Sequence, residues 1–257
     1  MSAEVIIEIR NLHTQFGITV IHENLNLDIQ RGEIMAIIGD SGAGKSTLLH
    51  EIMLLDKPLS GSIKVLGLDI LNLSEKQCLW LRRRCGVMFQ HGALFSSLTV
   101  AENVAVPLRE HTKLSKRLIR EIVAFKIALV GLPKSARNKY PSQLSGGMIK
   151  RAAVARALAL EPAILFLDEP TSGLDPVSAW ALDELILNLK QSLGLTVVII
   201  THDLDSLWAI TDRVAVLANK QVFAVTHINE LTQFEHPWIR NYFHGPRGRI
   251  AKDKYSI

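Results

Sequence analysis

The stretch GDSGAGKS, at residues 39–46, limits the possible folds more than any other part of the sequence. It matches the pattern G-x-x-x-x-G-K-[ST], follows the apolar run IMAII and precedes the helical pattern TLLHEIM, which is the context that this motif requires. Glycines let the backbone wrap closely around phosphate oxygens while successive amides and the helix N-terminus point at them. The stretch therefore predicts a strand, a phosphate-binding loop and a helix, with Lys45 on the β and γ phosphates and Ser46 on Mg²⁺. The residues expected to bind a nucleotide here are Gly39, Asp40, Ser41, Gly42, Ala43, Gly44, Lys45, Ser46 and Thr47.

Short apolar runs without alternation predict strands that are buried on both faces, as in a parallel sheet with helices on each side. The runs are IMAII (34–38), GVMF (86–89), AILFL (163–167), VVII (197–200) and VAVL (214–217). Between them lie helical patterns with apolar residues at the i, i+3, i+4, i+7 spacing of one face, such as Leu182, Leu185, Ile186 and Leu189. The sequence is therefore that of an α/β protein.

Two regions depart from this pattern. The first thirty residues and the stretch GSIKVLGLDI alternate and contain turn signals, which predicts an antiparallel β-patch beside the main sheet. Residues 91–160 are mainly helical in pattern, which predicts an inserted helical subdomain. Ser74 and Gln77 fit a capping box that opens a helix over 74–84, with three arginines at its C-terminal end. We expect one nucleotide-binding domain over 1–240 and a short tail over 241–257.

Composition excludes several classes of protein. The chain has 257 residues, of which 48% are hydrophobic, and a formal net charge of +4 with no basic stripe of the kind that nucleic acid requires. Neither a signal peptide nor an apolar run long enough for a membrane span is visible. Cys78 and Cys85 are not accompanied by other residues at the spacing of a metal site, which predicts free thiols in a reducing compartment. These features favour a soluble cytoplasmic protein that does not bind nucleic acid.

The stretch AILFLDEP is a second candidate for nucleotide chemistry. Asp168 ends a predicted buried strand, where its carboxylate can bind Mg²⁺ directly or through water. Glu169 follows, where it can polarise a water molecule aimed at the γ phosphate. The alternative is that the two carboxylates merely cap the next loop. Together with the phosphate loop, the pair favours catalysis.

With these stretches in hand, the chain resembles the nucleotide-binding subunit of ATP-binding cassette (ABC) transporters. The resemblance covers nearly its whole length, and the motifs occur in the family's order: the phosphate loop, Gln90, LSGGM (144–148), LDE (167–169), SGLD (172–175) and THD (201–203). It implies a P-loop NTPase fold of the ABC ATPase type, with a mostly parallel central sheet, an antiparallel β-subdomain and an inserted helical subdomain. It also implies ATP hydrolysis, with ATP and Mg²⁺ bound.

The stretch LSGGM contains paired glycines at a helix start without a lysine. In the family this helix faces the phosphate loop of a second copy, so that each ATP is held between two subunits. Ser145 offers a hydroxyl, Gly146 and Gly147 offer unobstructed amides, and the helix dipole favours the γ phosphate. Met148 replaces the family's usual glutamine, which removes a side-chain amide contact but leaves the serine and the backbone amides. The alternative reading of LSGG is a tight helix start.

The resemblance also assigns roles to four single residues, each with a structural alternative. Gln90 is expected to touch Mg²⁺ or the attacking water, or else to be a polar strand end. His202 is expected to contact the γ phosphate, although a lone histidine is often structural. Asp175 is expected to communicate across the dimer, or else to cap the helix that begins near Pro176. Phe16 lies where the family stacks an aromatic ring on adenine, or else is a buried strand aromatic.

The segment FQHGALFSSLTVAENVAVPL (89–108) is more apolar than a solvated loop should be. In the family the corresponding surface receives a short helix of an integral membrane permease, whereas the alternative is core of the helical subdomain. GALF and LSGGM resemble the ATPases of maintenance of lipid asymmetry (Mla) and related systems. That resemblance implies an MCE-domain lipid-binding subunit, a STAS-domain protein, phospholipid as cargo, and a location on the cytoplasmic face of the inner membrane.

Other readings share part of this pattern. A cassette for amino acid import or lipoprotein release would have the same catalytic residues. Translation-type members usually fuse two cassettes and repair-type members carry coiled-coil or zinc insertions, neither of which is visible, and a P-loop kinase lacks LSGG and the histidine. The stretch HPWIRNYFHGPRGR, after the run VAVL, contains Trp238, Tyr242 and Phe243, and we expect these aromatics to dock on the second copy.

Overall fold

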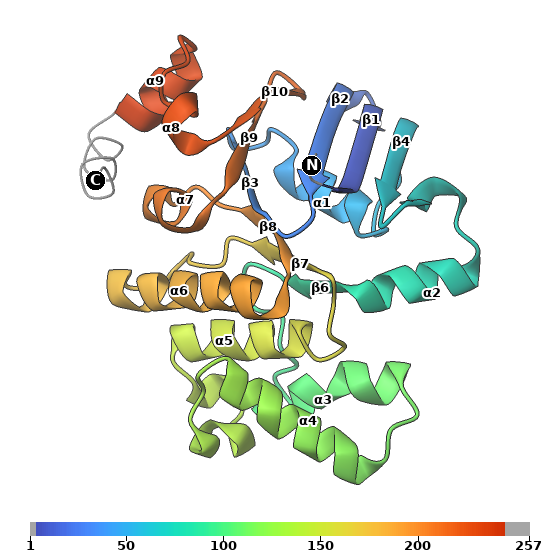
Figure 1. The fold of residues 1–257 in the computed structure, drawn as a ribbon, viewed down its shortest axis with the longest axis vertical. Coiled ribbons are helices and arrows are strands. Elements are labelled where there is room, and N and C mark those ends of the chain that lie inside the picture. The colour runs from blue at the N-terminus through green and yellow to red at the C-terminus, as the bar shows by residue number, and fades with distance from the viewer. Residues whose placement is uncertain (1–3, 245–257) are drawn as a thin grey trace. The chain divides into compact units, whose positions relative to one another are not determined.

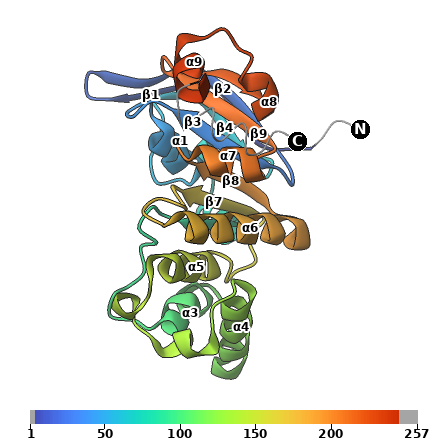
Figure 2. The ribbon, with the colours of Figure 1, turned by 90° about the vertical axis from the view of Figure 1, so that its left-hand side faces the viewer.

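A computed structural model describes residues 4–244 of the chain (Figures 1 and 2). The chain divides into two compact units. The first contains the residues up to Leu81 together with those from Thr196 onward, and the second contains Arg82–Leu195. None of the helices in the part that the structure describes is long and apolar enough to cross a membrane.

The first unit contains an antiparallel sheet built from the N-terminal region. Its strands are β1 (Val5–Phe16), β2 (Thr19–Gln30), β4 (Ser60–Val65) and β5 (Leu68–Asp69), in the order β2-β1-β4-β5. Figure 1 shows β2, β1 and β4 side by side. Ile7 and Ile9 are buried while Glu8 and Arg10 of β1 are partly exposed, as a sheet with one buried face requires. The predicted antiparallel patch is confirmed.

The same unit contains a second group of strands in which the chain is mostly parallel. These strands are β3 (Ile34–Gly39), β8 (Thr196–Ile200), β9 (Arg213–Ala218) and β10 (Gln221–Thr226). β3 pairs in parallel with both β8 and β9, while β10 is antiparallel to β9. All five residues of β8 are buried, which explains why its sequence shows no alternation. The described residues of this unit also form the 3₁₀ turn η1 (Ile70–Asn72) and the helices α1 (Lys45–Ile52), α7 (Leu204–Ile210), α8 (Ile228–Leu231) and α9 (Pro237–His244).

The helix α2 (Glu75–Arg84) begins where the capping box predicted it. The Ser74 amide donates to Gln77 Oε1 at 3.0 Å, and the Gln77 amide donates to Ser74 Oγ at 3.4 Å. Arg82, Arg83 and Arg84 form its last turn, where cations suit the helix dipole.

The second unit begins with the parallel pair β6 (Cys85–Met88) and β7 (Ile164–Asp168). Between these strands the chain forms no further strand in the structure, and the helical region predicted from the sequence is occupied by α3 (Val100–His111), α4 (Lys116–Leu129), η2 (Lys134–Asn138), η3 (Pro141–Gln143) and α5 (Gly146–Ala157). Figure 2 shows α3, α4 and α5 packed together below α6 (Pro176–Leu193). Val104 of α3 and Val123 of α4 are buried in this unit.

The C-terminal helix α9 crosses residue 240, where the sequence suggested that the domain would end. Its Phe243 side chain is only 2% exposed within the single chain, in a cluster with Leu207, Val216 and Leu231. The expectation that the tail aromatics all dock on a second copy is therefore wrong for Phe243, because packing in its own unit already buries that ring. Residues 245–257 of the expected tail lie outside the described residues.

The two cysteines are free, and burial raises the pKa of the Cys85 thiol to about 12. At pH 8 only about one Cys85 side chain in ten thousand is then the reactive thiolate. We expect Cys85 to resist iodoacetamide in the folded protein and to react fully in guanidinium chloride, as measured by peptide mass spectrometry. Equal labelling rates in the folded and denatured protein would contradict this.

Candidate active site

The predicted phosphate loop has a backbone that its glycines make possible. Gly39, Gly42 and Gly44 have φ values of 153°, 81° and 96°, which disfavour residues with a side chain. A Cβ added at Gly39 would lie 2.2 Å from the Leu217 carbonyl oxygen, and one at Gly44 would lie 2.5 Å from His22 Nε2. A Cβ at Gly42 would meet nothing within 4 Å, so that side of the loop is open. The loop is close-packed behind and open in front, as a cradle for an anion must be.

In the helix that follows the loop, no side chain caps the first backbone amides. α1 begins at Lys45, has no side-chain cap at its N-terminus and carries no acidic residue in its first turn. Uncapped amides and the positive end of the helix dipole favour a bound phosphate. Lys45 Nζ donates to the carbonyl oxygens of Gly39 (2.8 Å) and Asp40 (2.7 Å), which places the ammonium group inside the loop.

A buried polar cluster supports the loop from behind. Thr14 Oγ1 donates to Glu51 Oε1 at 2.6 Å, His22 Nδ1 lies 3.0 Å from Thr14 Oγ1, and His22 Nε2 lies 3.1 Å from the Gly44 carbonyl. The His22 and Glu51 side chains are fully buried. The sequence analysis missed this cluster. The one available signal was Glu51, an acid on the otherwise buried face of α1.

His202 lies at the same edge of the sheet as the phosphate loop. β3 and β8 are parallel neighbours, the loop follows the end of β3, and His202 follows the end of β8 by two residues. The side chain is exposed, while Asp203 caps α7 by accepting from the Asp205 amide at 3.0 Å. Phe16, at the end of β1, is 50% exposed. The alternative that Phe16 is a buried strand aromatic is therefore wrong.

In the second unit, β6 and β7 bring three further candidates to one edge. These strands are parallel neighbours, so Gln90 after β6 and the pair Asp168 and Glu169 at the end of β7 lie at their common carboxyl ends. Glu169 has φ 47°, a left-handed conformation that is uncommon for a residue with a side chain. Such strain is typical of functional positions, where the surrounding structure holds the backbone in place.

Lys150 of α5 joins these two segments. Its side chain is nearly buried, and its ammonium group donates to the backbone carbonyl of Gln90 and, at 3.1 Å, to that of Glu169. Burial lowers the pKa of Lys150, while the negative charges of Glu169 and Asp168 oppose that shift. The sequence analysis missed Lys150, because a lysine two residues after LSGGM looks like an ordinary surface residue.

The start of α5 presents the residues expected to face a second copy. Ser145 is the N-cap, and its Oγ accepts from the Met148 amide at 3.4 Å. Ser145 and Gly146 are exposed. Asp175 caps α6 by accepting from the Val177 and Ser178 amides at 3.1 and 3.0 Å. A hydrogen bond from the Ser178 side chain, together with those from these amides, holds the pKa of Asp175 below its usual value. The helix-cap alternative for Asp175 is thus confirmed.

The candidates therefore form two groups. The phosphate loop, His202 and Phe16 belong to the first unit, whereas Gln90, Asp168, Glu169, the LSGG segment and Asp175 belong to the second. Parallel strands bring the phosphate loop and His202 to one sheet edge in the first unit, and Gln90, Asp168 and Glu169 to one sheet edge in the second.

Comparison with known proteins decides the family. The model of the ABC transporter family matches residues 22–172, and this range begins before the phosphate loop and ends after Asp168 and Glu169. The chain belongs to the ABC transporter family. As a member of it, the cassette is an ATPase with the predicted P-loop fold, and the resemblance seen in the sequence is confirmed.

Individual relatives and solved structures agree with this assignment. The cassette is 40% identical to the intermembrane phospholipid transport system ATP-binding protein MlaF of Haemophilus influenzae, over 97% of this chain and 94% of that protein. It is 42% identical to the methionine import ATP-binding protein MetN of Mannheimia succiniciproducens, over 90% of this chain and 68% of that protein. Among solved structures, it is similar to a dimeric ATP-binding cassette bound to ADP and Pi, with a TM-score of 0.78 and 32% identity over 86% of this chain and 98% of that one.

The residues of the cassette fit the nucleotide and metal that the family implies. The loop has the conformation and the open face that a triphosphate needs. The predicted metal ligands are the side-chain oxygens of Ser46, Gln90 and Asp168, and Mg²⁺ prefers oxygen ligands. Within residues 4–244, no group of three or more His, Cys, Asp or Glu side chains could hold a metal alone. Mg²⁺ sites commonly use few protein ligands together with substrate phosphates, so donors of this chemical type suit that ion.

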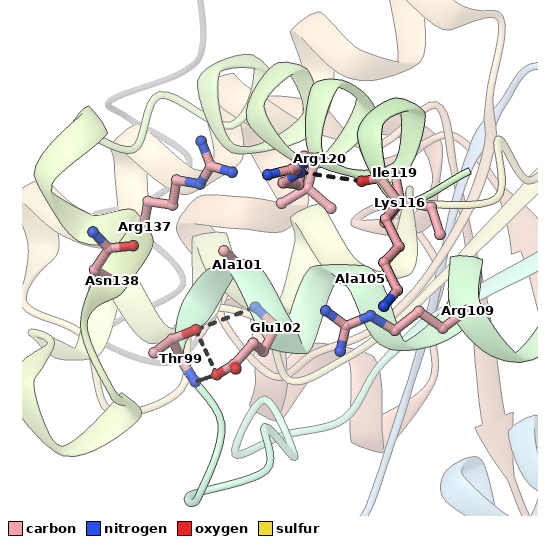
Figure 3. A pocket seen from close by; sticks show the side chains of 11 residues that line it. Thr99, Ala101, Glu102, Ala105, Arg109, Lys116, Ile119, Arg120, Arg137 and Asn138 are labelled. Carbon is pink, nitrogen blue, oxygen red and sulfur yellow. Dashed lines mark hydrogen bonds between the residues drawn. The ribbon is translucent and has the colours of Figure 1, made fainter. Parts of the chain in front are cut away.

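The helical region of the cassette has a separate cavity of about 900 Å³, between α3 and α4 (Figure 3). Ile119 and Val123 line it together with cationic side chains, and Figure 3 shows Arg109 and Lys116 pointing toward each other. At one end lies the capping box of α3, in which Thr99 and Glu102 bind each other. None of the predicted nucleotide-binding residues lines this cavity.

Replacing Lys150 by Met keeps the stem of the side chain and removes the ammonium group. We expect kcat for ATP to fall by about tenfold to a hundredfold, the range for the loss of one hydrogen bond from a charged donor, because the Gln90 and Glu169 segments lose their common anchor. A steady-state ATPase titration measures this effect. Lys134→Met, at an exposed position of the same unit, is the matched control. An unchanged kcat in a folded Lys150→Met protein would refute the anchoring role.

Proposed function

We propose that this cassette hydrolyses ATP to drive phospholipid transport across the bacterial envelope. The observation that carries the proposal is the 40% identity to MlaF over 97% of the chain. The GALF segment and Met148 of LSGGM support the same subfamily. The second candidate is amino acid import, favoured by the 42% identity to MetN. Both candidates share the ATPase chemistry and differ in the membrane partner.

The catalytic unit in this proposal is a dimer. The loop 39–47 of one copy holds the triphosphate, with Lys45 on the β and γ phosphates, and Ser145, Gly146 and Gly147 of the second copy close over the γ phosphate. The open front of the loop and the exposed start of α5 support this arrangement, since each leaves backbone amides available to an anion. The similar cassette bound to ADP and Pi is also dimeric. Asp175 lies in the same unit as the α5 start, where it would report on dimer closure.

Each of the remaining candidate residues has a separate role in ATP binding or hydrolysis in this proposal. Glu169 takes a proton from the attacking water as general base, and His202 orients that water and contacts the γ phosphate. The Gln90 side chain contacts either the attacking water or the metal and keeps it in position next to the γ phosphate. When bound, Mg²⁺ neutralises charge on the β and γ phosphates, and the hydroxyl of Ser46 and the carboxylate of Asp168 would hold it. The exposed ring of Phe16 stacks on the adenine base.

The segment 89–108 is the proposed contact with an integral membrane permease. Val100, Val104 and Leu108 are buried, so the core alternative is correct for them, but Phe95 is 53% exposed. The loop that carries Phe95 is held firmly, since Asn103 Oδ1 accepts from the Phe95 amide at 2.8 Å and Asn103 Nδ2 donates to the Phe95 carbonyl at 3.1 Å. An apolar ring on a fixed loop is suited to a partner surface.

The full proposal places the dimer on the cytoplasmic face of the inner membrane, as a peripheral protein held by the permease. An MCE-domain lipid-binding subunit and a STAS-domain protein complete the complex. The MlaF match supports these partners, and nucleic acid has no part in the proposal.

Replacing Glu169 by Gln keeps the shape of the side chain and removes the base. We expect ATP to bind with near-normal affinity and hydrolysis to fall by at least about a hundredfold, the usual contribution of a general base, so that a closed dimer accumulates. Size-exclusion chromatography with light scattering, with and without Mg-ATP, measures the dimer. Normal turnover in this variant would eliminate Glu169 as the base.

The proposed cargo is tested by identifying the membrane proteins that co-purify with the cassette. We expect purification from detergent-solubilised native membranes to recover a permease together with an MCE-domain protein, as identified by mass spectrometry. Phe95→Asp should reduce recovery of the permease without changing the ATPase activity of the isolated cassette, because a charge at an exposed contact prevents docking. Recovery of an amino acid permease instead would replace the lipid assignment with the import candidate.

A further inference from the structure

The helix α9 has two faces with different roles. Ile239 and Phe243, one turn apart, are 0% and 2% exposed and fix the helix to the core of the first unit. Trp238 and Tyr242, also one turn apart, lie on the adjoining face and pack against the edge of the same core, where their rings stack with centroids 4.7 Å apart and an angle of 15° between the planes. The buried face anchors the helix, so the stacked pair is held in a defined place.

Both rings of this pair donate a hydrogen bond to a nucleotide-site segment. Trp238 Nε1 donates to Asp40 Oδ1 at 2.6 Å, in the phosphate loop. The Tyr242 hydroxyl donates to the backbone carbonyl of His202 at 3.0 Å, after β8. All four residues belong to the first unit. One rigid aromatic pair thus bridges the two segments that the parallel strands β3 and β8 bring to the same edge.

We propose that Trp238 and Tyr242 are positioning residues for ATP turnover, with Trp238 controlling the carboxylate of the phosphate loop and Tyr242 fixing the backbone of His202. This proposal rests on the function proposed above for the loop and for His202. It adds a role for α9, which carries none of the predicted nucleotide-binding residues.

The role of Trp238 follows from charge. Asp40 is the one acidic residue in the stretch GDSGAGKS. A carboxylate that turned toward a bound triphosphate would repel it, because like charges at short distance raise the free energy of the complex. An indole N–H is a donor only, so its bond to Asp40 Oδ1 holds the carboxylate on the α9 side of the loop. The Asp40 carbonyl meanwhile accepts from Lys45 Nζ, so the same residue connects α9 to the lysine predicted to bind the phosphates.

The role of Tyr242 follows from the backbone. His202 stands between β8 and α7, and its imidazole direction depends on the local φ and ψ angles. Next to it, Thr201 Oγ1 accepts from the Asp203 amide at 3.0 Å, and Asp203 caps α7. The Tyr242 hydroxyl adds a fixed point at the His202 carbonyl itself. Its loss would affect the chemical step more than nucleotide binding.

The test compares Trp238→Phe and Tyr242→Phe in the full chain, since each keeps an aromatic ring on the anchored helix and removes the hydrogen-bond donor. We expect Trp238→Phe to raise KM for ATP by about threefold to tenfold, and Tyr242→Phe to lower kcat by about threefold to tenfold with KM unchanged. Trp80→Phe, an exposed tryptophan on α2, is the matched control. Melting temperatures of the variants check the fold, and unchanged KM and kcat in both folded variants would overturn the proposal.

A double-mutant cycle separates positioning from packing. In an Asp40→Asn protein the loop has no carboxylate to repel phosphate, so Trp238→Phe should no longer raise KM there. An equal rise in both backgrounds would show that the indole acts only through packing and would refute its role. As a readout without substitution, the indole Nε1–H resonance of Trp238 should shift when ADP is added to the unmodified protein. A resonance that stays fixed while loop signals move would also refute it.

Two further variants distinguish failure of this proposal from failure of the proposed function. Lys45→Ala should weaken ATP binding and His202→Ala should abolish hydrolysis if the assigned roles are correct. Normal activity in both would overturn the site assignment and, with it, the role of α9. Loss of activity in both, together with silent Trp238→Phe and Tyr242→Phe variants, would overturn the role of α9 alone.

Discussion

Hydrogen bonding between buried parallel strands is the constraint on which the rest of this cassette depends. A backbone removed from water must pair its polar groups, and parallel pairing forces neighbouring strands to end at the same edge. β3 next to β8 brings the glycine loop and His202 to one edge of the first unit, and β6 next to β7 brings Gln90 and Asp168 to one edge of the second. The candidate site is therefore a consequence of strand pairing, and each loop supplies only the local chemistry.

What could be predicted from the sequence was encoded locally. Unalternated apolar runs gave the buried strands, and the Ser74–Gln77 spacing gave the start of α2, because each signal lies within a few residues of the structure that it predicts. The glycine loop was predictable for the same reason: its conformation excludes side chains at fixed positions. The family resemblance then supplied roles that local physics alone leaves open, such as the dimer contact expected of Asp175, while the structure shows that the same side chain caps α6.

What the sequence analysis missed depends on contacts between distant segments. Lys150 binds a carbonyl 60 residues away, His22 supports a glycine 22 residues away, and Trp238 binds an aspartate 198 residues away. The residues next to a lysine, a histidine or a tryptophan in the sequence do not indicate which distant group its side chain will bind. The tail aromatics show the same limit: their composition suggested an interface, while packing placed Phe243 in the core and directed Trp238 and Tyr242 toward the first unit's own nucleotide-site segments.

The left-handed backbone of Glu169 has a consequence for how such a protein can lose its activity over time. A branched Cβ is poorly tolerated at φ 47°, where even an unbranched residue is strained by about 1–2 kcal/mol. An inactive copy that still folds would therefore carry glutamine, asparagine, aspartate or glycine at this position. Valine, isoleucine and threonine would be disfavoured there.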